Sequence, residues 1–185
     1  MILSAKGMSK AQLRRMKSYD YRFAMLVPIG KVRQEPFLVR KAGRESAIHV
    51  YVVETIRQFL RGHKLRPRRW ITKGTDLSVR QRYSSKRLVI EVETGMSYKK
   101  NKERLIRKFN ILKQKFDVII VLTNSFYKAR YEYLFPDIPI LLRQEILPYF
   151  EKIIDSLGYP RQRHKYYYSK PFIPYKRIKR ISKNI

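Results

Sequence analysis

Three acidic side chains, Asp76, Glu91 and Glu93, fall within 18 positions of a 185-residue chain that has only 14 acidic residues against 43 Lys and Arg. Glu91 and Glu93 stand two residues apart in the segment LVIEVETG (88–95), which otherwise has the apolar character of a β-strand. Carboxylates this close repel one another and shift one another's pKa values unless a cation lies between them. Hard divalent cations such as Mg²⁺ take oxygen ligands of this kind and keep waters for a substrate phosphate. The three residues therefore indicate a metal site that could activate water for phosphodiester hydrolysis.

Two predicted strands position these carboxylates. Segments 75–79 and 87–93 both alternate, and residues 80–86 between them make a plausible hairpin connection. In the second strand, alternation turns Glu91 and Glu93 to one face and the apolar side chains Leu88, Ile90 and Val92 to the other. Side chains two apart on a strand are roughly 6.5–7 Å apart at the Cα level. If the strands pair, Asp76 joins both glutamates in one cluster.

The flanking segments predict an α/β architecture. An amphipathic helix at 44–61 ends at Gly62, a long helix is expected at 97–116, and the continuous apolar run at 117–123 is typical of a strand buried in a parallel sheet. Strand, helix and strand from 88 to 123 form a right-handed βαβ unit. The remaining expected elements are a helix at 10–16, a strand within 23–30, a helix at 125–135, an edge strand at 138–142 and a final helix at 143–157 interrupted by Pro148.

Composition favours an intracellular protein that binds a polyanion. The formal net charge of +29 is extreme, and a partner that neutralises it would relieve the self-repulsion. Nucleic acid is the leading candidate, and an anionic membrane surface is the alternative. No apolar run approaches the ~20 residues that span a bilayer, and the N-terminal segment lacks a secretory apolar region. Because Cys is absent, thiolate metal sites are excluded. We expect a cytoplasmic location and no membrane insertion.

The pattern of Asp76 and the later E-V-E on two strands, followed by a helix and a buried strand, resembles the PD-(D/E)xK nuclease superfamily. This superfamily includes restriction endonucleases and Holliday junction resolvases, and the EVETG segment is also similar to archaeal plasmid and virus proteins of this class. The resemblance covers residues 44–123. It implies a restriction-endonuclease-like mixed β-sheet flanked by helices. We therefore expect a nuclease-like core at 44–158, preceded by an N-terminal segment at 1–43 and followed by a tail at 159–185 that is basic and Tyr-rich by its own composition. The resemblance also implies Mg²⁺ or Mn²⁺ held by Asp76 and Glu91.

Two positions depart from the family pattern. Thr75, before Asp76, stands where the family often has Pro, which is a minor change, and Glu93 stands where the family usually has lysine. Some members have E-x-E here and remain active, so Glu93 would serve as a ligand or water-orienting base. Lys99 or Lys100, at the start of the following helix, could supply the missing cation. Glu45 could be the acid that the family often carries on the first helix, or it could only stabilise the helix N-terminus.

Other titratable residues of this region have ordinary interpretations. Glu54 is expected to be an exposed helix residue. His49 and His63 lack recognisable partners for a ligand set, so neither is predicted to be a ligand.

Cationic residues before the first strand and in the tail could neutralise phosphates, and the Tyr run at 166–168 could stack on bases. The predicted nucleic-acid-binding residues are Arg66, Arg68, Arg69, Trp70, Arg161, Arg163, Lys165, Lys176, Arg177, Lys179 and Arg180. These contacts would position the backbone of DNA rather than read its sequence. A homodimer would let one active site address each strand.

Three functions remain open at this point. The first is a divalent-metal-dependent deoxyribonuclease. The second is a nuclease-fold DNA-binding protein without catalysis, such as a replication or recombination accessory factor, which the missing lysine favours. The third is an RNA-binding basic protein, which explains the charge but leaves the carboxylates unexplained. Substrate shape and the choice between internal and terminal cleavage are not determined.

Overall fold

The computed structural model describes residues 2–29, 33–41, 43, 45–69, 75–81 and 84–156. Its centre is a mixed four-stranded sheet in the order β4-β5-β6-β7, made of β4 (Leu77–Arg80), β5 (Arg87–Glu93), β6 (Phe116–Leu122) and β7 (Ile140–Leu142). β4 is antiparallel to β5, whereas β5, β6 and β7 are parallel. The predicted mixed α/β class is therefore confirmed, as is the burial of the apolar run in β6.

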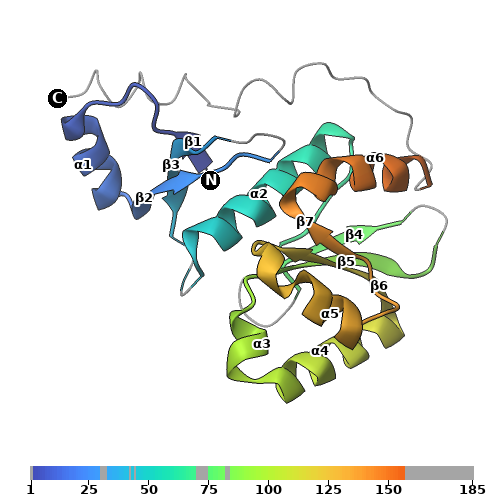
Figure 1. Cartoon of the computed structure of the whole chain (residues 1–185). Helices are drawn as coiled ribbons and strands as arrows, with labels where there is room; N and C mark the ends of the chain where they lie inside the picture. The colour runs from blue at the N-terminus through green and yellow to red at the C-terminus, as the bar shows by residue number, and fades with distance from the viewer. Residues whose placement is uncertain are drawn as a thin grey trace.

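Helices cover both faces of this sheet (Figure 1). On one face lie α2 (Ala47–Gly62) and α6 (Ile146–Ser156), which enclose the larger core with Leu77, Ile90 and Val121. On the other lie α3 (Met96–Lys100), α4 (Lys102–Lys115) and α5 (Lys128–Leu134), whose smaller core contains Phe109 and Ile120. Because β5 alternates, its apolar residues face the first layer and its glutamates face the second.

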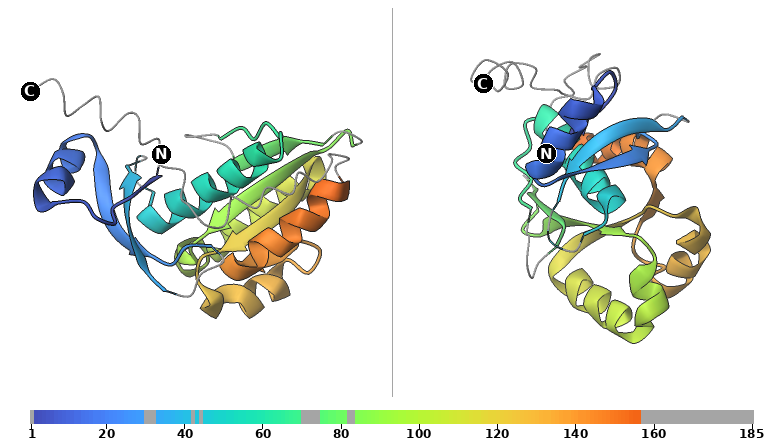
Figure 2. Two further views of the ribbon diagram at one scale, coloured as in Figure 1. Left: turned by 90° about the horizontal axis from the view of Figure 1, so that it is seen from above. Right: turned by 90° about the vertical axis from the view of Figure 1, so that its left-hand side faces the viewer.

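The first part of the chain forms a separate three-stranded antiparallel sheet in the order β1-β3-β2. Its elements are β1 (Ile2–Ser4), α1 (Lys10–Ser18), β2 (Tyr21–Leu26) and β3 (Glu35–Arg40). Both helix and strand were expected here, but β1 and β3 were missed. The small sheet lies beside α2 (Figure 2), and its residues Ile2, Phe37 and Val39 join the larger core.

Three expectations about helices need correction. The predicted helix at 97–116 is two helices, because Asn101 has φ −157° and its side chain caps α4 by accepting a hydrogen bond from the Arg104 N–H. Pro148 does not interrupt α6, since it lies in the first turn, where backbone N–H groups have no intrahelical partner. Glu54 is buried rather than exposed, and it pairs with Arg57 at 3.0 Å.

Two shorter elements complete this part of the chain. A 3₁₀ turn, η1 (Ser125–Tyr127), precedes α5, and another, η2 (Arg143–Glu145), precedes α6. Within the described ranges, no helix has both the length and the apolar character that crossing a membrane requires.

Candidate functional site

Asp76 lies directly before β4, and strand pairing brings it to β5. Leu77 is opposite Ile90 in the antiparallel register, so Asp76 reaches the stretch of β5 that carries the glutamates. Its Oδ2 accepts a hydrogen bond from the Val92 N–H at 2.7 Å. This bond anchors the carboxylate at the point where β5 has no further partner residue in β4.

Glu91 and Glu93 are buried in the sheet. Their side chains expose only 2% and 7% of their surface, although carboxylates are almost never buried without partners. A solvent-facing position on an edge strand, the ordinary explanation for such a pair, is excluded because β5 lies between β4 and β6. The two glutamates therefore need a compensating charge from the helices that cover this face.

Lys108 supplies that charge from α4. Its Nζ lies 2.6 Å from Oε2 of Glu91 and 3.2 Å from Oε1 of Glu93, so one ammonium bridges both carboxylates. The Lys108 side chain as a whole keeps 40% of its surface exposed, while its ammonium contacts the two buried carboxylates. The other oxygen of Glu91, Oε1, is buried without a hydrogen-bond partner among the described residues.

The electrostatics of this group are strongly perturbed. Burial raises the pKa of Glu91 to about 7, and the charges of Asp76 and Glu93 add to this rise while Lys108 opposes it. Desolvation disfavours the charged form of Lys108, but Glu91 and Glu93 outweigh it and raise the pKa of Lys108 to about 12. The ammonium therefore stays charged at neutral pH, whereas Glu91 is close to its titration midpoint.

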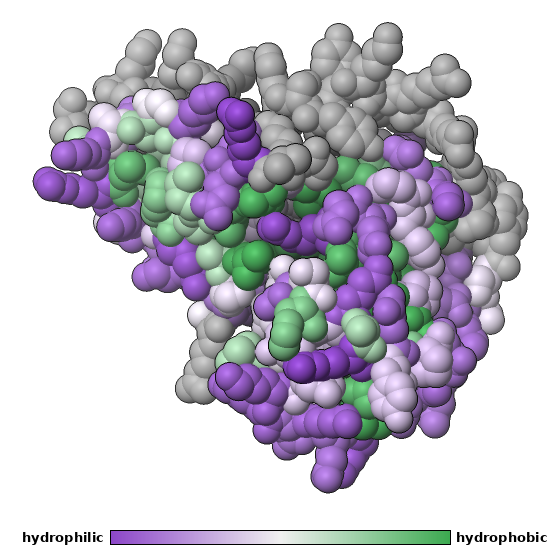
Figure 3. Space-filling view, viewed as in Figure 1, coloured by the Kyte–Doolittle hydropathy of each residue, from purple (hydrophilic) through white to green (hydrophobic). Residues whose placement is uncertain are grey.

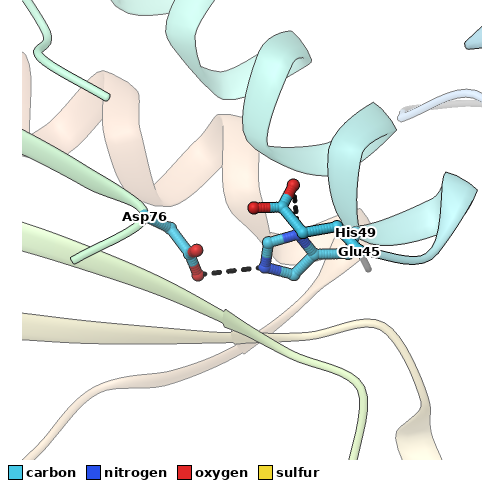
Figure 4. A group of neighbouring side chains, drawn as sticks. All are labelled: Glu45, His49 and Asp76. Atoms are coloured by element: carbon cyan, nitrogen blue, oxygen red, sulfur yellow. Dashed lines mark ion pairs between the residues drawn. The ribbon is translucent and has the colours of Figure 1, made fainter. Parts of the chain in front are cut away.

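A second group of side chains also includes Asp76 (Figure 4). His49 on α2 sits between Asp76 and Glu45, with Nε2 3.1 Å from Asp76 Oδ2 and Nδ1 3.4 Å from Glu45 Oε2. Arg69 also contacts the Glu45 carboxylate, at 2.5 Å. Each of the three side chains Glu45, His49 and Asp76 offers a ligand atom within 4.8 Å of the others. Among the described residues, this group meets that spacing, whereas Asp76, Glu91 and Glu93 do not form such a group.

The titration of Asp76 and His49 follows from this contact. Desolvation would raise the pKa of Asp76, but the hydrogen bond and charge of His49 and the Val92 N–H lower it overall. Desolvation likewise would lower the pKa of His49, but Asp76 and Glu45 raise it overall. The expectation that His49 lacks suitable partners is therefore wrong, because its partners come from segments separated from it in sequence or by one helical turn.

The structure also locates the cations that were proposed from the sequence. Lys99 and Lys100 are exposed on α3, and the lysine that contacts Glu91 and Glu93 is Lys108, which sequence reasoning missed. Its position offered one signal, since Lys108 lies three residues after the buried Leu105 and next to the buried Phe109. That spacing puts it at the border of the buried stripe of the helix.

The predicted nucleic-acid-binding residues divide into two sets. Arg66 and Arg68 are exposed, and the Arg68 backbone pairs with Ser78 in both directions at 2.9 Å, which extends the edge of β4. Arg69 forms an ion pair with Glu45. The others, Trp70, Arg161, Arg163, Lys165, Lys176, Arg177, Lys179 and Arg180, lie outside the described residues, as does the Tyr run at 166–168.

The side chains that meet the spacing for a shared cation are Glu45, His49 and Asp76, which offer two carboxylates and one imidazole. Glu91 lies outside this group, and its Oε1 is a buried acceptor without a hydrogen-bond partner among the described residues. Lys108 adds a positive charge that could face a phosphate. Comparisons with protein-family models, with curated proteins and with solved structures find no match for this chain.

Proposed function

We propose that this protein is a divalent-metal-dependent nuclease that hydrolyses DNA phosphodiester bonds, with a restriction-endonuclease-like core. The observation that carries the proposal is the bridge from Lys108 to Glu91 and Glu93. It supplies, from the helix after the second strand, the cation that the E-V-E segment lacks. The order of elements supports the same assignment: α2 is followed by Asp76 and β4, then by β5 with its two glutamates, then by α3, α4 and β6.

Each residue then has a role that its position supports. Asp76 and Glu91 would hold Mg²⁺ or Mn²⁺, which supplies Lewis acidity and a water of low pKa when bound. Glu93 would orient the attacking water. Lys108, charged at neutral pH and partly exposed, would stabilise negative charge that develops on the phosphate oxygens.

Substrate binding follows from the charge of the chain. A net charge of +29 favours association with the DNA backbone, and such binding weakens steeply as salt rises. His49 and Arg69 hold Glu45 beside Asp76, so they position this carboxylate at the edge of the site.

The test is cleavage of plasmid, linear and branched DNA with Mg²⁺ or Mn²⁺ by the wild type and two variants. Asp76→Asn and Lys108→Met should each lower the cleavage rate by roughly 100-fold or more, as loss of one preorganised electrostatic group does. Lys113→Met is the matched control on the same helix, because the Lys113 side chain is 48% exposed and its ion pair, at 3.7 Å, is with the exposed Asp137. Full cleavage by Asp76→Asn would refute the assignment.

One observation favours a second candidate, a nuclease-fold DNA-binding protein without catalysis. Lys108 already compensates the two buried glutamates, so the fold does not require a metal for charge balance. This alternative predicts no cleavage under any metal condition. It also predicts salt-sensitive DNA binding that is equal in the wild type, Asp76→Asn and Lys108→Met.

A further inference from the structure

Aromatic and cationic side chains gather just beyond the C-terminal ends of β5 and β6. The group consists of Tyr98 on α3, Phe126 and Tyr127 in η1, and Arg130 on α5, and we call it the aromatic–arginine cluster. The Arg130 guanidinium carbon lies 4.4 Å from the centroid of the Phe126 ring and 5.8 Å from those of Tyr98 and Tyr127. Phe126 and Tyr127 meet edge to face, with centroids 5.3 Å apart.

Close packing ties this cluster to the carboxylate site. Gly95, two residues after Glu93, has φ +84°, and a Cβ added to it would lie 2.2 Å from the Tyr127 ring. The Tyr98 ring is 5.9 Å from Tyr127 and 6.0 Å from the buried Tyr131. Burial raises the pKa of the Tyr131 hydroxyl, and the charge of Glu93 adds to this rise.

The outer part of the cluster is not explained by core packing. The Phe126 side chain is 65% exposed, and Tyr133, three residues after Arg130 on α5, is 85% exposed. Arg130 lies against the exposed Phe126 ring, and Tyr133 stands three residues further along the same helix. Exposure of one ring is ordinary on a protein surface, but Phe126 stands against the Arg130 guanidinium, and the two together form an exposed stacking surface that fits a ligand with flat faces.

The surroundings indicate which ligand. α3 carries the exposed Lys99 and Lys100, and the outer face of α4 adds Arg104 and Arg107. In the space-filling view, the part of the molecule where α3 and α4 lie is largely hydrophilic (Figure 3). A cationic surface beside exposed rings and a guanidinium combines phosphate neutralisation with base stacking, which is how proteins bind single-stranded nucleic acid.

We propose that the aromatic–arginine cluster binds unpaired nucleobases of a DNA substrate. Paired bases lie within the duplex stack, so their faces cannot reach a surface ring unless they are unpaired. The position of the cluster next to Glu93 means that a single-stranded segment would lie beside the cleaved phosphate, and this part of the inference rests on the proposed nuclease function. Substrates with flaps, gaps or branches are therefore preferred over continuous duplex.

The experiment compares two fluorescent probes in EDTA, so that no cleavage occurs. One is a duplex with a short single-stranded flap, and the other is the same duplex with abasic residues in the flap, which keeps every phosphate and removes the bases. Wild type should bind the first more tightly by roughly 5- to 100-fold, the range for one base–aromatic stack. Phe126→Leu keeps apolar bulk without a ring and should bring this ratio close to one, whereas Phe126→Trp should preserve it.

Phe23→Leu is the matched control, since Phe23 is 44% exposed on β2 in the other sheet and should leave the ratio unchanged. Equal affinity of the wild type for both probes would overturn the inference, as would an unchanged ratio in Phe126→Leu. A Phe126→Leu variant that changes oligomeric state but not the ratio would show a self-association surface and also overturn it. If the protein prefers the flap with bases but cleaves no DNA, the inference about base binding is supported and the proposed hydrolysis is refuted. If it cleaves DNA but shows no such preference, the proposed hydrolysis is supported and the inference about base binding is refuted.

Discussion

Replacing Glu91 with Gln should stabilise the protein at alkaline pH while abolishing the proposed hydrolysis. The Glu91 side chain exposes only 2% of its surface, and Lys108 contacts one of its two carboxylate oxygens. The other oxygen, Oε1, has no hydrogen-bond partner among the described residues. Gln keeps the shape of the side chain, and its amide oxygen can still accept from Lys108, but it carries no charge to desolvate. The substitution therefore removes a cost that the wild-type fold bears.

The magnitude follows from the pKa of Glu91, which is about 7 in the fold against its ordinary 4.5. The unfolded chain releases this proton at lower pH than the folded protein does. The protonated Glu91 carboxyl therefore makes its full contribution to the free energy of unfolding below pH 4.5. This contribution is lost as the pH rises through 7. Each unit of difference between the folded and unfolded pKa corresponds to about 1.36 kcal/mol. Ionisation of Glu91 therefore lowers the free energy of unfolding by up to about 3 kcal/mol at pH 8, but by only about 0.4 kcal/mol at pH 4.5.

Urea unfolding of the wild type and Glu91→Gln in EDTA, at pH 4.5 and pH 8, measures this difference. Glu91→Gln should be more stable by about 1–3 kcal/mol at pH 8 and nearly equal at pH 4.5. Glu132→Gln is the control, since Glu132 is 51% exposed and its 3.9 Å pair with Lys128 is a weak surface contact. Equal or lower stability of Glu91→Gln at pH 8, or the same difference at both pH values, would refute the reasoning.

Two further measurements address the neighbouring contacts. Desolvation lowers the pKa of His49, but pairing with Asp76 and Glu45 outweighs this effect, so NMR should place the pKa of the imidazole above 6.5. The Asp76→Asn substitution should lower that pKa. The stability from this pair is complete below pH 6.5 and lost as pH rises through the raised pKa, and an unchanged pKa in Asp76→Asn would contradict it. Gly95→Ala should lower the free energy of unfolding by about 1–3 kcal/mol more than Gly7→Ala, because both have positive φ but only Gly95 abuts Tyr127. Equal losses in thermal or urea unfolding would show that backbone strain alone matters.

The centre of the fold could be predicted because its elements have strong local patterns. β5 alternates over seven residues and β6 carries five consecutive buried residues, so periodicity identifies both strands. β1 and β3 offer no such signal: β1 has three residues, and the first residues of β3 include Pro36. β1 exists because it pairs with β3 across more than thirty positions, Ile2 with Val39, and such pairing is not visible in a local pattern. β3 also pairs with the nearby β2, down to Glu35 opposite Leu26, but its own residues do not alternate in a way that identifies it.

The break between α3 and α4 was hidden for a related reason. The residues around Asn101 are almost all polar, so helical periodicity cannot show whether one helix continues or two meet. The deciding feature is the cap, in which the Asn101 side chain accepts from the Arg104 N–H at 2.8 Å. Asn can occupy a helix interior at modest cost, and only the tertiary packing of Leu105 and Phe109 against the sheet settles its role.

In the candidate site, the acidic residues could be predicted from the sequence but Lys108 could not, and the reason lies in the composition of the chain. Carboxylates are scarce in this chain, so three of them near two strands carry information, and the sequence leads to Asp76, Glu91 and Glu93. Lys and Arg number 43, so almost any helix after β5 would present several near the site, and sequence spacing alone could not separate Lys99 or Lys100 from Lys108. Geometry separates them: α3 ends at Lys100, α4 begins after the cap residue Asn101, and Lys108 at the border of the buried face of α4 reaches both glutamates. In a strongly basic protein, the acids of a site can be found from sequence, whereas the cation that serves them is fixed by helix placement.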